Sequence, residues 1–157
     1  MIGFNIYKAP PLVLEKINGL CTLLWQGKRK YEQVSAAIPN KELSRTILSL
    51  AQETNQYASE LWCQILTLGG IYQKENRDSI ETGVAGFLNE QDLMNFCELN
   101  EKELLGAYRD ILNESFMHEG LRKMIRYQLN GILCSFSQLK LLNSLKFDNF
   151  RNAPLII

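Results

Sequence analysis

Apolar residues recur along most of this chain in alternating steps of three and four, and this period limits the fold more than any other feature. The first stripe consists of Val13, Ile17, Leu20, Leu24, Gly27, Tyr31, Val34 and Ile38. Three more stretches repeat the pattern. A period near 3.5 residues keeps apolar side chains on one side of a helix and favours near-parallel packing against other helices. The stripes predict four amphipathic helices, at about 12–38, 41–68, 90–112 and 118–146.

The residues between the stripes indicate how the helices connect. Pro39 lacks an amide and ends the first helix, while Asn40 and Asn89 can accept from first-turn amides and so start the second and third. Gly69 can end the second helix in a left-handed turn. Connections that are short, long and short favour two antiparallel hairpins joined by a crossover at 69–89. We therefore expect an all-α, ferritin-like four-helix bundle, with residues 1–157 forming one domain.

The long connection contains apolar residues of its own. They are Ile80, Val84, Phe87 and Leu88. Their spacing predicts a short extra helix within the crossover.

Charge and cysteine usage narrow the classes of function. Lys plus Arg equals Asp plus Glu at 17 each, so no overall field favours nucleic acid or an anionic membrane. No apolar run is long enough for a membrane span, and the first residues do not resemble a secretory signal. The four cysteines, Cys21, Cys63, Cys97 and Cys134, form no C-x-x-C pair. They are typical of reduced thiols in a cytoplasmic protein rather than of a zinc site.

Four segments together resemble a known family. They are "WQGKRKYEQVSAAI", "LAQETNQYASELWCQILTLGG", "CELNEKELLGAYRDIL" and "LRKMIRYQLNGILCSFSQL". The more specific marks within them are Gly27 with Tyr31 and Ser35-Ala36-Ala37, Leu68 to Gly70, Glu98 and Glu101 before Ala107-Tyr108, and Gln128. Over roughly residues 14–146 the chain is similar to an uncharacterised bacterial domain-of-unknown-function family of the ferritin-like superfamily.

The resemblance implies a ferritin-like fold and a bacterial cytoplasmic setting, but no activity, because the family has no agreed one. Members often carry a histidine late in the fourth helix, where this chain has Phe136. This departure weakens any metal role that the resemblance would imply.

The carboxylates of this chain do not meet the requirements of a ferritin-like di-iron site. Such a site takes a Glu from each of two helices and Glu-x-x-His from each of the other two. The only histidine is His118, before the fourth helix, and residues 121–146 contain no Asp, Glu or His. We therefore expect no metal and no cofactor. If a metal is bound, the ligands are Glu53, Glu98 and Glu101, which favour a hard ion such as Mg²⁺ or Ca²⁺.

One carboxylate differs from the rest because Glu101 occupies a core position of its stripe. Pairing the helices about their short turns places Gly27 level with Thr54, and Glu101 near Gln128, with Tyr108 as a further candidate partner. A buried carboxylate needs hydrogen bonds or a proton. This polar core layer either fixes the register of the helices or is a remnant of a metal or ligand site.

His118 suggests one rival function, that of a four-helix phosphotransfer domain. Such domains phosphorylate an exposed histidine in the middle of a helix. His118 lies at a helix start, and the adjacent Glu119 would repel a phosphoryl group. The pattern does not favour this function.

The remaining evidence favours a protein that acts through contacts with other proteins. Residues 1–11 and 147–157 lie outside the stripes yet are partly apolar, and Trp25 and Trp62 lie beside the stripes, where they could anchor an interface. We expect a non-enzymatic bundle that forms a homo-oligomer, with no nucleic-acid or membrane partner. The alternative is a ferritin-like metal-binding protein or oxidoreductase with a degenerate carboxylate site. The sequence does not identify a protein partner or a cellular role.

Overall fold

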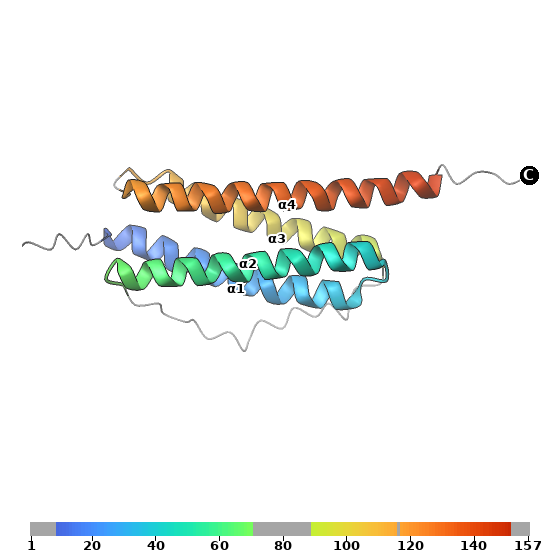
Figure 1. Ribbon diagram of the computed structural model, residues 1–157, viewed down its shortest axis with the longest axis horizontal. Coiled ribbons are helices and arrows are strands. Elements are labelled where there is room, and N and C mark those ends of the chain that lie inside the picture. The colour runs from blue at the N-terminus through green and yellow to red at the C-terminus, as the bar shows by residue number, and fades with distance from the viewer. Residues whose placement is uncertain (1–8, 71–88, 116, 152–157) are drawn as a thin grey trace, which may run out of the picture.

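Four helices form the part of the chain that this computed structural model describes: residues 9–70, 89–115 and 117–151, with 146–151 as backbone only. They are α1 (Pro11–Ala37), α2 (Lys41–Thr67), α3 (Glu90–Leu112) and α4 (Glu119–Arg151) (Figure 1). The described residues contain no strand, so the expected all-α class with four helices is confirmed. α4 continues to Arg151, past the end expected near residue 146. The expected extra helix lies at 71–88, outside the described residues, and stays a prediction.

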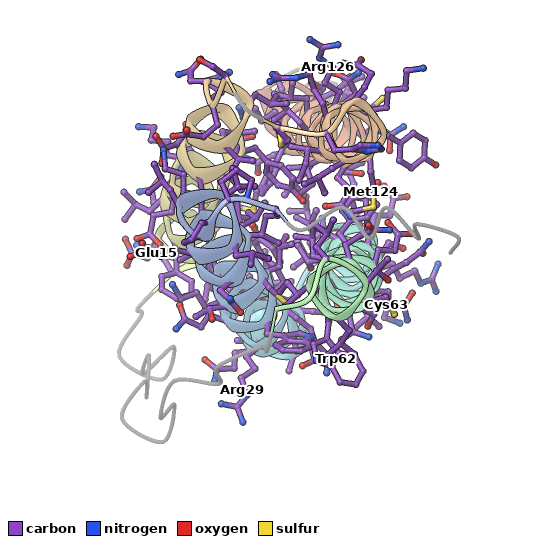
Figure 2. All side chains as sticks on the ribbon, turned by 90° about the vertical axis from the view of Figure 1, so that its left-hand side faces the viewer. Glu15, Arg29, Trp62, Cys63, Met124 and Arg126 are labelled. Atoms are coloured by element: carbon purple, nitrogen blue, oxygen red, sulfur yellow. The ribbon has the colours of Figure 1, made fainter. Side chains whose placement is uncertain are left out.

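The helices occupy the corners of a square in which every neighbouring pair is antiparallel. α1 and α4 each pack against both α2 and α3 (Figure 2). Contacts fix the directions: along α1, Lys16 meets Asp110 near the end of α3, whereas Lys30 meets Asn100 nearer its start. Because α2 and α3 therefore run in the same direction, the end of α2 and the start of α3 lie at opposite ends of the bundle (Figure 1).

The helix ends form for the local reasons that the sequence indicates. The side chain of Asn40 accepts from the amide of Leu43 at 3.0 Å, and that of Asn89 accepts from the amide of Asp92 at 2.9 Å. Each bond satisfies one of the amides that a first helical turn leaves free. Gly69, after α2, has φ 81°, a conformation that glycine adopts without a steric penalty. These three predictions are confirmed.

The apolar stripes of the four helices meet along the axis of the bundle and form one core. Its largest fully buried side chains include Tyr31, Tyr108 and Phe136. The rings of Tyr31 and Phe136 meet edge to face across the diagonal from α1 to α4, with centroids 5.9 Å apart. Burial raises the pKa of the Cys97 thiol to about 12, so this thiol is un-ionised and unreactive at neutral pH.

None of the described helices combines the length and the apolar character needed to cross a bilayer.

Candidate functional site

α2 and α4 meet along a line of mostly polar residues that we call the α2–α4 seam. Its residues are Glu53, Tyr57 and Glu60 on α2, and Gln128, Gly131 and Ser135 on α4. Glu53 accepts from the hydroxyl of Ser135 at 2.6 Å and from that of Tyr57 at 2.9 Å. Both donors are neutral, so hydrogen bonds rather than an opposite charge hold this half-buried carboxylate. Burial and then the bond to Glu53 raise the pKa of Tyr57, which keeps its hydroxyl protonated.

A buried amide continues the seam into α3. The Gln128 side chain accepts from the Tyr108 hydroxyl at 2.8 Å and donates to Glu60 at 3.0 Å and to the Tyr57 carbonyl at 3.3 Å. Gln128 and Tyr108 are fully buried, and burial raises the pKa of Tyr108. Three helices thus share one satisfied hydrogen-bond network, which fixes their relative register.

The two helices of the seam approach closely at one glycine. A Cβ added to Gly131 would lie 2.0 Å from the Tyr57 hydroxyl and 3.2 Å from a carboxylate oxygen of Glu53. Any side chain at this position would displace the tyrosine and break its bond to Glu53. Gly131 therefore makes room for the seam.

The structure differs from the expected position of Glu101. Glu101 is buried, as predicted, but its carboxylate pairs with Lys140 at 2.8 Å rather than with Gln128. The expected pairing of α3 with α4 about the turn between them placed Glu101 near Gln128. The observed contacts of Arg122 and Gln128 move α4 by about one helical turn relative to α3, which brings Lys140 within reach of Glu101.

The other members of the expected polar layer also separate. The Thr54 hydroxyl bonds within α2, to the carbonyls of Leu50 and Ala51. Gly27 lies against Asn100 of α3, whose amide nitrogen is 2.8 Å from where a Cβ at Gly27 would be. Of the predicted residues, the structure brings Gln128 and Tyr108 into direct contact, while Glu101, Thr54 and Gly27 make separate contacts.

Gly27 and Asn100 adjoin a buried hydroxyl that forms no hydrogen bond with the described residues. This hydroxyl belongs to Tyr31, and the amide nitrogen of Asn100 is likewise unpaired. Burial raises the pKa of Tyr31 well above its ordinary value of 10. The side-chain oxygen of Asn100 accepts from Lys30 at 3.4 Å. The α1–α3 contact is thus less completely paired than the α2–α4 seam.

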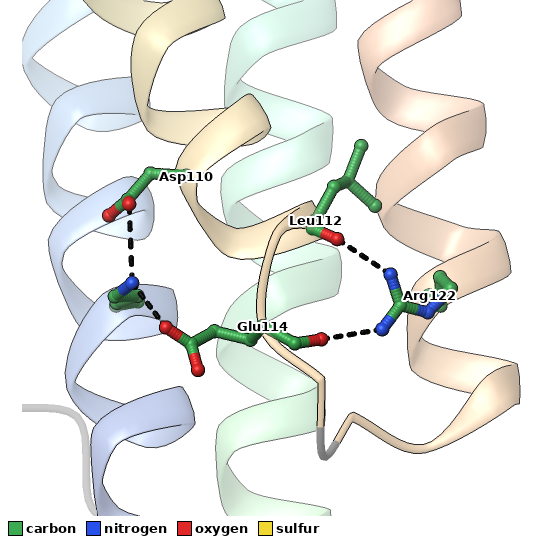
Figure 3. Close-up of polar contacts among 5 residues, drawn as sticks. Asp110, Leu112, Glu114 and Arg122 are labelled. Carbon is green, nitrogen blue, oxygen red and sulfur yellow. Dashed lines mark hydrogen bonds and ion pairs between the residues drawn. The ribbon is translucent and has the colours of Figure 1, made fainter.

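Ion pairs join the start of α1 to the end of α3, as Figure 3 shows. Lys16 of α1 pairs with Asp110 at 3.2 Å and also with Glu114, and these carboxylates raise the pKa of its ammonium group. Arg122 donates to the carbonyls of Leu112 and Glu114 and so ties the start of α4 to the turn before it. An open hollow of about 410 Å³ lies beside Lys16, and both charged residues of its lining, Lys16 and Asp110, pair with each other.

The carboxylates do not form a ferritin-like metal site. Glu53 is held by hydroxyls of α2 and α4, Glu101 is paired with Lys140, and Glu98 is exposed on α3. Among the residues that the structure describes, no group of three His, Cys, Asp or Glu side chains could hold a metal ion. The donor set does not fit a di-iron centre, and we derive no metal chemistry from it.

The middle stretches of α2 and α4 carry almost no charge on their outer surface. Between residues 46 and 67 the only charged residues are Glu53 and Glu60, both bonded to α4, and between 127 and 145 the only one is Lys140, paired with α3. We call the outward side chains of these two stretches the uncharged face. Its exposed members on α4 include Tyr127, Cys134, Gln138, Leu141 and Leu145. Figure 2 shows Cys63 and Met124 on this side of the bundle and Glu15 on the opposite side.

Sequence reasoning missed Glu60, Ser135 and Asn100 as contributors to the polar contacts. Glu60 and Ser135 flank the α2–α4 contact, and only their hydrogen bonds distinguish them from surface residues. The uncharged face, by contrast, has a sequence signal: nineteen residues from 127 to 145 that contain Lys140 as their only charge. The expected anchors differ in exposure, since Trp62 is exposed and Trp25 is partly buried. His118 is exposed before α4.

Comparison with protein-family models and with curated proteins finds no match to this chain.

Proposed function

We propose that this protein is a non-catalytic, ferritin-like helical bundle that acts through protein contacts, and that it associates with itself through the uncharged face. The observation that supports this proposal is the near absence of charged residues from two adjacent helical stretches, 46–67 and 127–145, that expose large apolar side chains. The bacterial cytoplasmic setting implied by the family resemblance is part of the same proposal.

A helix that only faces water normally carries charged residues on its outward side. α3 does so, with Glu98, Lys102, Glu103 and Arg109 all exposed. Residues 127–145 of α4 instead expose Tyr127 by 68%, Leu141 by 61% and Leu145 by 48%. The centre of a protein interface is depleted in charge and enriched in tyrosine and other large side chains. The composition of α4 therefore fits a surface that is covered in the working state.

The uncharged face is two helices wide, because its stretches lie side by side. The pairs Glu53–Ser135 and Glu60–Gln128 align residues 46–61 of α2 with residues 127–142 of α4. α2 contributes serine, threonine and glutamine side chains together with the exposed Leu48, Trp62 and Leu66, and α4 contributes Tyr127, Leu141 and Leu145. Such a surface supports a modest, reversible association rather than an obligate one.

Sedimentation of the full chain over a range of about 1 µM to about 1 mM tests this proposal. We expect the weight-average mass to rise from that of the 18.0 kDa monomer toward that of a dimer or larger species. Leu141→Lys introduces a charge into the uncharged face, and it should raise the dissociation constant at least about tenfold.

Leu99→Lys is the matched control, because Leu99 on α3 is 62% exposed and Leu141 is 61% exposed. It adds the same charge on a face that is already charged, and it should leave association unchanged. A monomer at every concentration would contradict the proposal. Equal weakening by both substitutions would show that the α2/α4 side is not the contact surface.

A further inference from the structure

α4 carries a row of outward residues at heptad spacing, and this row gives the uncharged face a specific geometry. Tyr127, Cys134 and Leu141 are separated by seven residues, or two helical turns, and all three are exposed. Gln138 and Leu145 follow four residues after the second and third of them and share the same side of the helix. No charged residue lies within this row.

We infer from this pattern that the partner is a second copy of this chain. The α4 helices of the two copies pack antiparallel about a two-fold axis at Cys134. This inference rests on the function proposed above. Two-fold symmetry then places Tyr127 beside Leu141 of the partner and Asn130 beside its Gln138. Apolar residues meet apolar ones, and amides meet amides that can exchange hydrogen bonds.

Charge at the helix ends favours the antiparallel arrangement over a parallel one. Lys123 and Arg126 are exposed near the start of α4. In a parallel pair these cations would face the same cations of the partner. In an antiparallel pair about Cys134 they lie level with Leu145 and Leu142 of the partner, so neither cation faces its own copy.

The length of α4 agrees with the same arrangement. The end of α4 projects beyond the other three helices of its own bundle (Figure 1). With Cys134 on the axis, residues 147–151 lie level with residues 117–121 of the partner, at the start of its α4. The projecting turn of each copy is therefore covered by the other copy, whereas a parallel pair would leave both ends uncovered.

Thiol cross-linking of the full chain tests the arrangement at concentrations where sedimentation shows association. A short bis-maleimide should join two chains through Cys134, and Cys134→Ser should abolish this product. Cys63 is also exposed but lies on α2, so Cys63→Ser should leave the product unchanged. An associated protein whose cross-link survives in Cys134→Ser, or that gives no cross-link, would overturn the inference.

Two variants distinguish the directions of the helices. Tyr127→Cys and Leu141→Cys are each made in chains that also carry Cys63→Ser and Cys134→Ser. An antiparallel pair predicts that neither variant cross-links alone and that their mixture does. Cross-linking of each variant alone would indicate a parallel pair and overturn the inference.

The outcomes separate this inference from the proposed function. A wild-type protein that stays monomeric contradicts both. An associated protein that fails these cross-linking tests contradicts only the antiparallel arrangement about Cys134.

Discussion

The two sides of this bundle distribute their charges in opposite ways. The α1/α3 side exposes charged residues such as Glu15, Arg29 and Glu103, and ion pairs of Lys16 hold its end. The α2/α4 side places its carboxylates, Glu53 and Glu60, in the seam between the helices, where they accept from neutral donors. Within residues 46–67 and 127–145 of this side, the only other charged residue is Lys140, which pairs with Glu101 of α3.

The two sides are therefore suited to different surroundings. Exposed charges keep a surface hydrated and discourage association. Hydrogen bonds from neutral donors to Glu53 and Glu60 hold α2 and α4 in one register. The two helices can then present the uncharged face in one fixed arrangement.

Gly131→Ala should give the largest loss of stability. The added Cβ collides with the Tyr57 hydroxyl, so we expect the free energy of unfolding to fall by about 3 kcal/mol even though alanine favours helix. On the α1/α3 side, a Cβ at Gly106 meets nothing within 4 Å. Gly106→Ala should therefore raise stability by about 0.5–1 kcal/mol. Urea denaturation measures both, and equal effects would mean that the seam is not closely packed.

Gln128→Leu should cost somewhat less, about 2–3 kcal/mol, because it leaves the buried Tyr108 hydroxyl without its acceptor. Tyr108→Phe removes that hydroxyl, so the double variant should be less destabilised than the sum of the two single variants. A double-mutant cycle from thermal or urea unfolding measures the coupling. Strict additivity would contradict the hydrogen-bond network of the seam.

Glu101 tests the ion pair that its buried carboxylate forms with Lys140, between α3 and α4. Glu101→Ala should cost about 2 kcal/mol, through a cavity and the lost contact with Lys140. Glu101→Gln keeps the shape and an acceptor for the lysine, so it should cost below about 1 kcal/mol. If both variants were as stable as the wild type by urea denaturation, Glu101 would be solvated and the observed register of α4 would be incorrect.

Alkaline pH should reveal the buried tyrosines, with no effect at neutral pH. Burial raises the pKa of Tyr31, Tyr57 and Tyr108 above the ordinary value of 10. A tyrosine whose pKa is higher in the folded state contributes stability that is complete below pH 10 and is lost as the pH rises above it. The free energy of unfolding should fall above about pH 10, and tyrosinate absorbance should rise fully only on unfolding. Full ionisation in the folded state would contradict the burial of these rings.

The sequence predicted the helices and their buried sides well, because these depend on local spacing. Leu24, Leu61, Leu104 and Ile132 lie on the predicted stripes, and each is fully buried. Asn40 and Gly69 end or start helices as expected for the same local reason. Burial of Glu101 was also predictable from its place in the third stripe.

The polar contacts between helices were less predictable, because they depend on register. A shift of about one turn is enough to exchange one partner of Glu101 for another. Arg122 bonds two carbonyls of the turn between α3 and α4, and no spacing rule specifies these contacts. The close approach at Gly131 likewise arises from the position of a tyrosine on another helix.

Hydrogen exchange at low and high protein concentration tests the central claim most directly, because it reports on both sides of the bundle in one experiment. Association through the uncharged face predicts that amides in residues 127–145, and to a lesser degree 46–67, exchange more slowly at high concentration. Amides of α1 and α3 should exchange equally at both concentrations. Slowing confined to α1 and α3, or no dependence on concentration anywhere, would contradict the account.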